Sequence, residues 1–286
     1  MRGKIYKGIG GFYYIEAEDD NQYECKARGK FRREKITPMI GDEVEIEVKN
    51  GKGAITEIYP RRNKLIRPAV ANIDLIAVVA AAKSPDPHPT LIDKMLVNAE
   101  INRIEPIVCF NKCDLADCGE LISVYERAGY KTLAVSAETG EGTDELFKAI
   151  EGRVTAFAGV SGVGKSSLLT LITGSELETG AVSEKISRGR HTTRHTELFK
   201  IKGGGYVLDT PGFSSIEPEE ITPEDLADCF PEMREVKGEC RFRGCAHIGE
   251  PDCAVKKKLA EGGIAESRYN SYKELYEVQR SRKSWK

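Results

Sequence analysis

One short segment of this sequence restricts the fold more than any other. The residues GVSGVGKS at 159–166 follow the apolar run Val154–Ala158 and precede a segment with helical spacing. Glycines there let successive backbone N–H groups converge on phosphate oxygens, while Lys165 adds positive charge and Ser166 a hydroxyl group for Mg²⁺. A strand, a phosphate loop and a helix in this order indicate a doubly wound α/β sheet. Phosphate contacts are predicted for Gly159, Val160, Ser161, Gly162, Val163, Gly164, Lys165, Ser166 and Ser167.

A second motif, Asn111-Lys112-Cys113-Asp114, follows the apolar run Ile107–Phe110. A carboxylate such as Asp114 can accept two hydrogen bonds from the N1–H and the exocyclic amine of guanine. Adenine offers no such pair of donors, and a buried carboxylate left unpaired costs several kcal/mol. The later segment Ser136–Gly140 supplies a backbone N–H for guanine O6. The sequence therefore favours GTP over ATP and assigns the base contacts to Asn111, Lys112, Asp114, Ser136 and Ala137.

The order of these motifs is unusual. In ordinary small GTPases the phosphate loop comes first, whereas here the guanine motif precedes it. The GTPase domain is therefore predicted to be circularly permuted, which preserves the site and relocates the chain ends. Asp209-Thr210-Pro211-Gly212 leads directly into the C-terminal segment, so this segment can respond to the nucleotide state.

The Mg²⁺ and γ-phosphate contacts are expected around this Asp-x-x-Gly motif. Asp209 ends an apolar strand and is placed to hold the Mg²⁺ shell through water, while the N–H of Gly212 reaches the γ-phosphate. In the loop 189–194, Thr193 is the first choice for the threonine that binds Mg²⁺ together with Ser166, and Thr192 is the second.

A histidine is the candidate for activating water. Phe213 stands where many GTPases have a water-orienting glutamine, and an apolar side chain cannot do this. His191 has hydrogen-bonding nitrogens and a pKa near neutrality, whereas His195 is interpreted as solvent-exposed. The predicted catalytic residues are His191, Lys165 and Gly212.

A cluster near the C-terminus has the spacing C-x4-C-x-H-x5-C, formed by Cys240, Cys245, His247 and Cys253. Three thiolates and one imidazole make a closed tetrahedral Zn²⁺ site, which favours a structural role over a catalytic one. The alternative is four unrelated residues. A structural zinc ion is predicted because the segment is too short to bury a good apolar core of its own.

The chain is expected to contain three domains. Residues 1–66 alternate apolar and polar positions in short runs, which predicts an all-β, five-stranded barrel of the oligonucleotide-binding (OB) type. Residues 67–218 form the permuted α/β GTPase domain, with strands at 73–80, 106–110, 132–135 and 154–158 and helices at 91–103 and 144–150. Residues 219–286 form a small helical zinc-binding domain.

Within the predicted barrel, the basic run Lys26–Arg33 is expected on a hairpin or loop. Several aromatic side chains are available to stack on bases, but core packing is expected for most of them. These residues are Tyr6, Phe12, Tyr13, Tyr14 and Tyr23.

Charge is segregated along the chain although the 286 residues carry a net charge of only −2. Residues 1–68 have 15 basic and 11 acidic side chains, and residues 254–286 have 9 and 4, so both ends are basic around an acidic centre. This distribution is typical of a protein that docks on RNA phosphates, with ordinary solvated charge as the alternative. The sequence contains no long apolar run and no secretion signal, which favours a cytoplasmic protein without membrane insertion.

In their combination and order, these motifs resemble the ribosome small-subunit-dependent GTPase A family, also called RsgA or YjeQ, over essentially the whole chain. The resemblance implies a factor that binds the small ribosomal subunit and its rRNA late in maturation, hydrolyses GTP faster when bound, and then leaves. It also implies that His191 is the catalytic histidine and that the barrel contacts rRNA. The expected cofactors are one structural Zn²⁺ and Mg²⁺ with GTP, and the protein is expected to be monomeric.

One position departs from some related permuted GTPases. Gly162 stands where they carry an asparagine linked to potassium activation, so potassium stimulation is not assumed. Two other functions are weighed against the assembly factor. The first is a GTP-controlled RNA-binding module with another RNA partner. The second is a phosphoryl-transfer enzyme, which the guanine motifs and the absence of any recognisable acceptor pocket disfavour.

Overall fold

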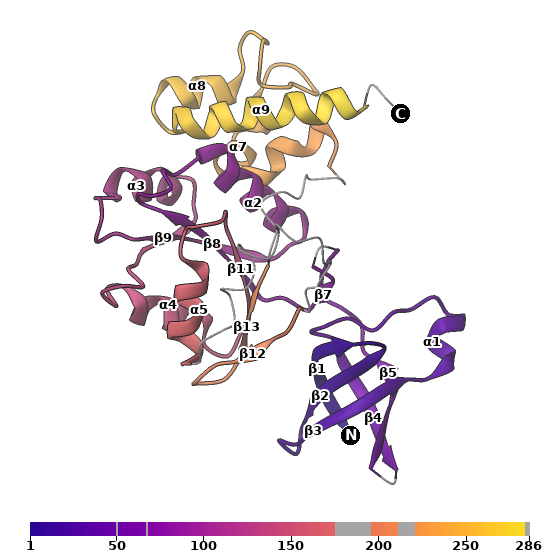
Figure 1. Cartoon of the computed structure of the whole chain (residues 1–286). Coiled ribbons are helices and arrows are strands. Elements are labelled where there is room, and N and C mark those ends of the chain that lie inside the picture. The colour runs from indigo at the N-terminus through magenta and orange to yellow at the C-terminus, as the bar shows by residue number, and fades with distance from the viewer. Residues whose placement is uncertain (50, 67, 175–195, 211–220, 284–286) are drawn as a thin grey trace, which may run out of the picture. The chain divides into compact units, whose positions relative to one another are not determined.

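The computed structural model of the chain describes residues 1–49, 51–66, 68–174, 196–210 and 221–283 (Figure 1). The chain divides into two compact units. The first unit comprises Met1–Leu75, Ile150–Phe157 and Ser166–Pro211, and the second comprises Ile76–Ala149, Ala158–Lys165 and Gly212–Lys286. Among the helices in these described ranges, none has the length and apolar character needed to cross a membrane.

The N-terminal residues form a closed five-stranded barrel with the strand order β1-β2-β3-β5-β4. Strands β3 and β5 pair in parallel and the other neighbours are antiparallel, with β1 closing against β4. The predicted OB-type barrel is confirmed, because the alternating apolar residues give every strand one inward face. The strands are β1 (Arg2–Ile9), β2 (Phe12–Ala17), β3 (Gln22–Ala27), β4 (Glu43–Lys49) and β5 (Lys52–Ile58).

The barrel core is mainly aliphatic, so the expectation that most of the five aromatic residues fill it is wrong. All five are only partly buried. Successive side chains of a strand point to opposite faces, so Tyr14 points away from the core that its neighbour Ile15 enters. Tyr13 and Tyr23 pack against the core without being fully buried. The core consists of Ile5, Ile15, Ala17, Cys25, Phe31, Val44, Ile46 and Ile55.

The basic run Lys26–Arg33 was expected on a hairpin or loop, and this prediction is wrong for most of it. Lys26 lies in β3, and Gly29–Arg33 form the short helix α1. Phe31 is buried in the barrel core and fixes this helix to the barrel. Basic residues in the last turn of α1 interact favourably with its free carbonyl groups.

A six-stranded sheet has the order β10-β9-β8-β11-β13-β12. β9 pairs in parallel with β10, β11 pairs in parallel with β13, and the edge strand β12 is antiparallel to β13. Every residue of β8 and β11 is buried, as expected for strands covered on both faces. The strands are β8 (Leu75–Ala81), β9 (Glu105–Asn111), β10 (Lys131–Ala134), β11 (Val154–Ala158), β12 (Phe199–Lys200) and β13 (Tyr206–Asp209).

A small sheet lies between the barrel and these strands in the sequence, and helices connect the strands. A two-stranded sheet pairs β6 (Lys64–Leu65) with β7 (Val70–Ala71). Helix α3 (Gly119–Arg127) and all but the last residue of α4 (Thr143–Ile150) belong to the second unit, whereas α5 (Lys165–Thr173) lies almost wholly in the first. The helix predicted at 144–150 is therefore present, one residue longer.

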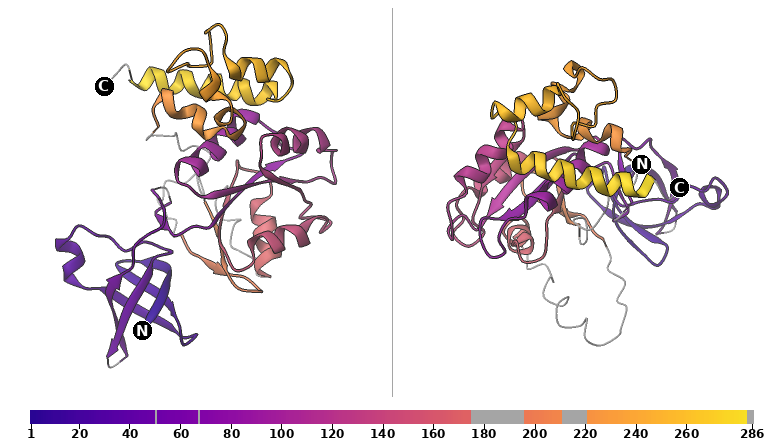
Figure 2. Two further views of the ribbon diagram at one scale, coloured as in Figure 1. Left: turned by 180° about the vertical axis from the view of Figure 1, so that it is seen from behind. Right: turned by 90° about the horizontal axis from the view of Figure 1, so that it is seen from above.

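Helix α2 (Pro89–Ile101) is buried along most of its circumference, because every residue from Ile92 to Ala99 is buried. A helix that covers only one face of a sheet would keep a polar outer stripe. In α2 that outer side is covered by α9 (Glu266–Lys283), which lies along it (Figure 2).

The C-terminal segment shares its apolar core with α2. Val97 of α2 belongs to the same buried cluster as Leu226, Phe230 and Met233. Tyr272 and Leu275 of α9 complete the contact with α2 and the short C-terminal helices. This shared core compensates for the small size of the segment. Its other elements are η3 (Pro223–Cys229), α7 (Pro231–Arg234), η4 (Lys237–Glu239) and α8 (Ala254–Ala260).

Candidate nucleotide site and metal centre

The phosphate loop lies between β11 and α5, as its sequence predicts. Gly162 and Gly164 have φ angles of +84° and +89°, a region that L side chains rarely adopt. A Cβ atom at Gly159 would lie 2.3 Å from the carbonyl oxygen of Val79, so the loop also needs a glycine for its close approach to β8. Helix α5 begins at Lys165, so the following backbone N–H groups lie at its positive end.

The ammonium group of Lys165 is held inside this loop. Its Nζ donates hydrogen bonds to the carbonyl oxygens of Gly159 and Val160, at 2.8 and 3.0 Å. The charge is therefore already placed at the loop whose backbone N–H groups are predicted to bind phosphate oxygens. A cation there complements the β- and γ-phosphates of a nucleotide.

Asn111 joins the predicted guanine motif to both neighbouring motifs. Its Nδ2 donates to the carbonyl oxygen of Val163 in the phosphate loop at 2.8 Å. Its Oδ1 accepts a hydrogen bond from the backbone N–H of Ala137 at 3.0 Å. A Cβ atom at Gly164 would lie 2.2 Å from the Asn111 Nδ2, so glycine is required there. This buried amide thus holds the three predicted binding segments together.

The other residues predicted to contact the guanine base lie beside Asn111. The Asp114 Oδ1 accepts a hydrogen bond from the hydroxyl group of Ser136 at 2.6 Å, which orients an otherwise exposed carboxylate. The Lys112 Nζ donates to the carbonyl oxygen of Ser84, in the connection between β8 and α2. Ser84 was not predicted from the sequence, because a backbone carbonyl carries no residue-type signal.

The predicted Mg²⁺ and γ-phosphate residues are only partly described by the structure. Asp209 ends β13, and Thr210 after it donates both its backbone N–H and its hydroxyl group to the carbonyl oxygen of Phe157 in β11. Ser166 and Ser167 lie in the first turn of α5. The remaining positions lie outside the described residues, and they are His191, Thr192, Thr193, His195, Gly212 and Phe213.

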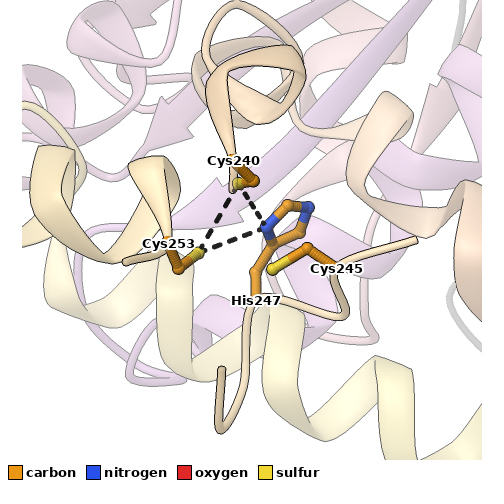
Figure 3. Close-up of side chains that lie close together, drawn as sticks. All are labelled: Cys240, Cys245, His247 and Cys253. Atoms are coloured by element: carbon orange, nitrogen blue, oxygen red, sulfur yellow. Dashed lines mark hydrogen bonds between the residues drawn. The ribbon is translucent and has the colours of Figure 1, made fainter. Parts of the chain in front are cut away.

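The four predicted metal ligands come together in the C-terminal segment (Figure 3). The Cys240 Sγ lies 3.5 Å from the His247 Nδ1 and 3.8 Å from the Cys253 Sγ, and this Nδ1 lies 3.4 Å from the Cys253 Sγ. Cys245 completes a group whose ligand atoms all lie within 4.8 Å of one another. Tetrahedral zinc bond lengths place sulfur atoms about 3.8 Å apart and sulfur about 3.6 Å from nitrogen, so the geometry fits such an ion.

The backbone around the predicted metal ligands is fixed by two neighbouring sets of contacts. The Glu250 carboxylate accepts hydrogen bonds from the backbone N–H groups of Ala246, Ile248 and Gly249. Burial raises the pKa of Glu250, but these hydrogen bonds outweigh it and lower the pKa below its ordinary value. From α9, the hydroxyl group of Tyr269 donates to the His247 carbonyl oxygen at 2.6 Å.

The state of the histidine also suits metal binding. Burial lowers the pKa of His247, which favours the neutral ring that coordinates a metal. Glu250 and Tyr269 were not predicted from the sequence. Glu250 could have been suspected of supporting the site, because it is an acidic residue between the last two predicted ligands. Tyr269 lies in α9, away from the ligands in sequence, so nothing in the local sequence pointed to it.

Together the sheet, the phosphate loop and the guanine motif in reversed order define a circularly permuted GTPase, joined to an OB-type barrel and a Cys₃His metal site. Comparison with known proteins supports this assignment. Residues 2–55 match the model of the RsgA N-terminal domain, and residues 58–219 match that of the RsgA GTPase. The chain belongs to the RsgA GTPase family, and it is accordingly a GTP-hydrolysing enzyme.

Individual relatives are similar over their full length. The small ribosomal subunit biogenesis GTPase RsgA of Agathobacter rectalis is 47% identical, and that of Clostridium botulinum strain Hall is 49% identical, with both chains fully covered. Among solved structures, YloQ, described as a circularly permuted GTPase, is 37% identical with a TM-score of 0.84, covering 98% of this chain and 95% of its own. YjeQ from Thermotoga maritima is also 37% identical, with a TM-score of 0.82 and coverage of 97% and 98%.

Proposed function

We propose that this GTPase acts in the late maturation of the small ribosomal subunit. In this proposal the subunit stimulates GTP hydrolysis, and the nucleotide state controls binding and release. The observation that carries the proposal is full-length similarity to proteins named small ribosomal subunit biogenesis GTPases. The basic N- and C-terminal segments support it further, because rRNA presents a dense array of phosphates. The protein acts in the cytoplasm as a monomer.

In this proposal each domain has a separate task. The barrel of residues 1–66 contacts rRNA, residues 67–218 bind and hydrolyse GTP, and residues 219–286 hold one structural Zn²⁺. The fit of the Cys₃His group to tetrahedral geometry supports zinc, and its four protein ligands leave no position for a substrate. Ser166 and Thr193 hold Mg²⁺ directly, and Asp209 acts through water. The phosphate loop and the guanine motif bind the nucleotide through the residues assigned above.

The test is the rate of GTP hydrolysis by the purified protein, measured alone, with isolated small subunits and with large subunits. We expect slow hydrolysis alone and a selective increase with small subunits. Without an increase at large excess, the assembly function would be rejected. If binding then proves equally strong on unrelated RNA, the protein would instead be a GTP-regulated RNA-binding module with another partner.

Changing Asp114→Asn should weaken the selection of guanine. The amide presents a donor where the carboxylate presents two acceptors, which should cost about 1–3 kcal/mol, or about ten- to a hundredfold in GDP affinity. Competition between labelled GDP and unlabelled GDP, XDP and ADP measures this selectivity. Asp117→Asn is the matched control, since it makes the same change in the same loop at a side chain that accepts a hydrogen bond from Gly119. Equal GDP affinity in the two variants would contradict the assignment.

Changing His191→Ala should leave GTP binding intact and slow hydrolysis on the small subunit by about 10²–10⁴-fold, the usual contribution of a group that positions or deprotonates water. Single-turnover hydrolysis with saturating small subunits is the measurement. His195→Ala, nearby in sequence, is expected to hydrolyse GTP normally. Normal turnover by the His191 variant would remove this residue from the catalytic set.

A further inference from the structure

A buried ionic cluster joins α2 to the C-terminal helices. Arg268 of α9, Asp93 of α2 and Glu232 of α7 are 1%, 0% and 3% exposed. The guanidinium Nη1 donates to the Asp93 Oδ1 at 2.5 Å, while Nε and Nη2 donate to the two oxygens of Glu232 at 2.8 and 3.0 Å. Three aromatic rings surround the guanidinium group, with centroids 4.6 to 5.6 Å from its central carbon: Phe230, Tyr130 and Tyr125.

Stability alone is a weak explanation for this cluster. The desolvation of buried charges offsets most of their attraction, so apolar residues of similar volume often stabilise a core equally well. The guanidinium group, however, has rigid, planar donor geometry. It can satisfy both carboxylates only when α2, α7 and α9 hold one relative position. The cluster therefore specifies the position of α2 against the C-terminal segment.

Further polar contacts fix the same helix at both ends. In its first turn the hydroxyl group of Thr90 donates to the Glu274 Oε2 of α9 at 2.9 Å. In its last turn Glu100 forms an ion pair of 3.1 Å with Arg234 of α7. The second unit thus contains α2 and the C-terminal helices as one packed body. A displacement of α9 must be passed on to α2.

The chain that enters α2 contacts the nucleotide motifs. In the connection 82–88, the Ser84 carbonyl oxygen accepts the hydrogen bond from Lys112, and the backbone N–H of Ala82 donates to the Asn111 carbonyl oxygen at 2.7 Å. Pro85 of the same connection lies 3.7 Å from the position that a Cβ atom of Gly162 would occupy. The connection therefore contacts the guanine motif and lies close to the phosphate loop.

We propose that Asp93 and Arg268 are positioning residues that couple the C-terminal segment to the nucleotide loops. RNA that binds the exposed basic side chains of this segment, such as Arg241, Lys257 and Arg280, shifts α9. The cluster transmits the shift to α2, and the connection 82–88 transmits it to the nucleotide motifs. This inference rests on the proposed function, because it requires a partner that speeds hydrolysis.

Two matched substitutions separate coupling from stability. Asp93→Asn removes the charge that ties α2 to Arg268, and leaves Arg268 and Glu232 as a neutral pair. Glu232→Gln removes a comparable buried charge from the same cluster, but leaves the link between α2 and α9 in place. Both preserve side-chain volume, and both variants are first shown by thermal unfolding to be folded.

The first measurement is the stimulation of GTP hydrolysis by small subunits. We expect Asp93→Asn to lower this stimulation about tenfold, with unchanged hydrolysis in the free protein, and Glu232→Gln to retain most of it. Full stimulation of the Asp93 variant, or an equal loss in both variants, would overturn the inference.

The second measurement needs no ribosome. Amide hydrogen exchange in the free protein should be faster in residues 82–88 for Asp93→Asn and unchanged there for Glu232→Gln. Unchanged exchange in the Asp93 variant would reject the coupling even if small subunits stimulate the wild type. Conversely, an unstimulated wild type would reject the proposed function, and the exchange result would still decide whether the cluster reaches the nucleotide loops.

Discussion

Lys165→Ala should reduce GTP hydrolysis at least about a thousandfold, because it removes the cation that we propose stabilises charge on the β- and γ-phosphates as the reaction proceeds. The hydrogen bonds of Lys165 to the Gly159 and Val160 carbonyl oxygens show that the loop holds the ammonium group in place. No other residue at this position can supply a flexible point charge there, and Arg would have to place a larger planar group in the same space.

Single-turnover hydrolysis and equilibrium binding of a fluorescent GTP analogue measure the two consequences separately. Lys148→Ala, in the last turn of α4, is the control for loss of a lysine elsewhere in the domain. Hydrolysis within about tenfold of the wild type by a folded Lys165 variant would exclude this residue from transition-state stabilisation.

Cys253→Ser should release the metal ion and unfold much of the C-terminal segment. Structural zinc contributes about 10–16 kcal/mol in isolated zinc-finger peptides, more than the whole stability of many domains. The segment shares its apolar core with Val97 of α2, so the loss should reach the GTPase domain and lower its melting temperature and nucleotide affinity as well.

The matched control is Cys229→Ala, which removes a buried thiol from the same core but from outside the metal cluster. We expect this control to keep one zinc ion per chain by elemental analysis, with a loss of only about 1 kcal/mol of stability. Retention of stoichiometric zinc and an unchanged melting curve in the Cys253 variant would contradict a structural role for the site.

Local sequence patterns were sufficient to predict most strands and helices. The phosphate loop, the guanine motif and the four metal ligands each bring their chemistry within a few neighbouring residues. The strand predicted at 154–158 coincides with β11, and the helix predicted at 91–103 corresponds to α2, shifted by two residues. These segments have the periodicity or the turn residues that their structure requires.

The features that the sequence did not predict have a common physical cause. Each depends on contact between distant parts of the chain. The pattern of β2 did not reveal that Ile15 rather than Tyr14 faces inward, because this depends on its pairing with other strands. Asp93 and Arg268 are 175 residues apart, so neither carries a local sign of its partner. An acidic residue in a helix is usually exposed, and only the packing of α9 on α2 explains why Asp93 is buried.

The shared core of α2 and α9 also affects how the chain folds during its synthesis. Helix α2 leaves the ribosome long before α9, because the two helices lie far apart in the sequence. During that interval one side of α2, Val97 included, has no permanent cover. The shared core can therefore form only after α9 has left the ribosome, and until then α2 exposes an apolar surface that chaperones and proteases can recognise.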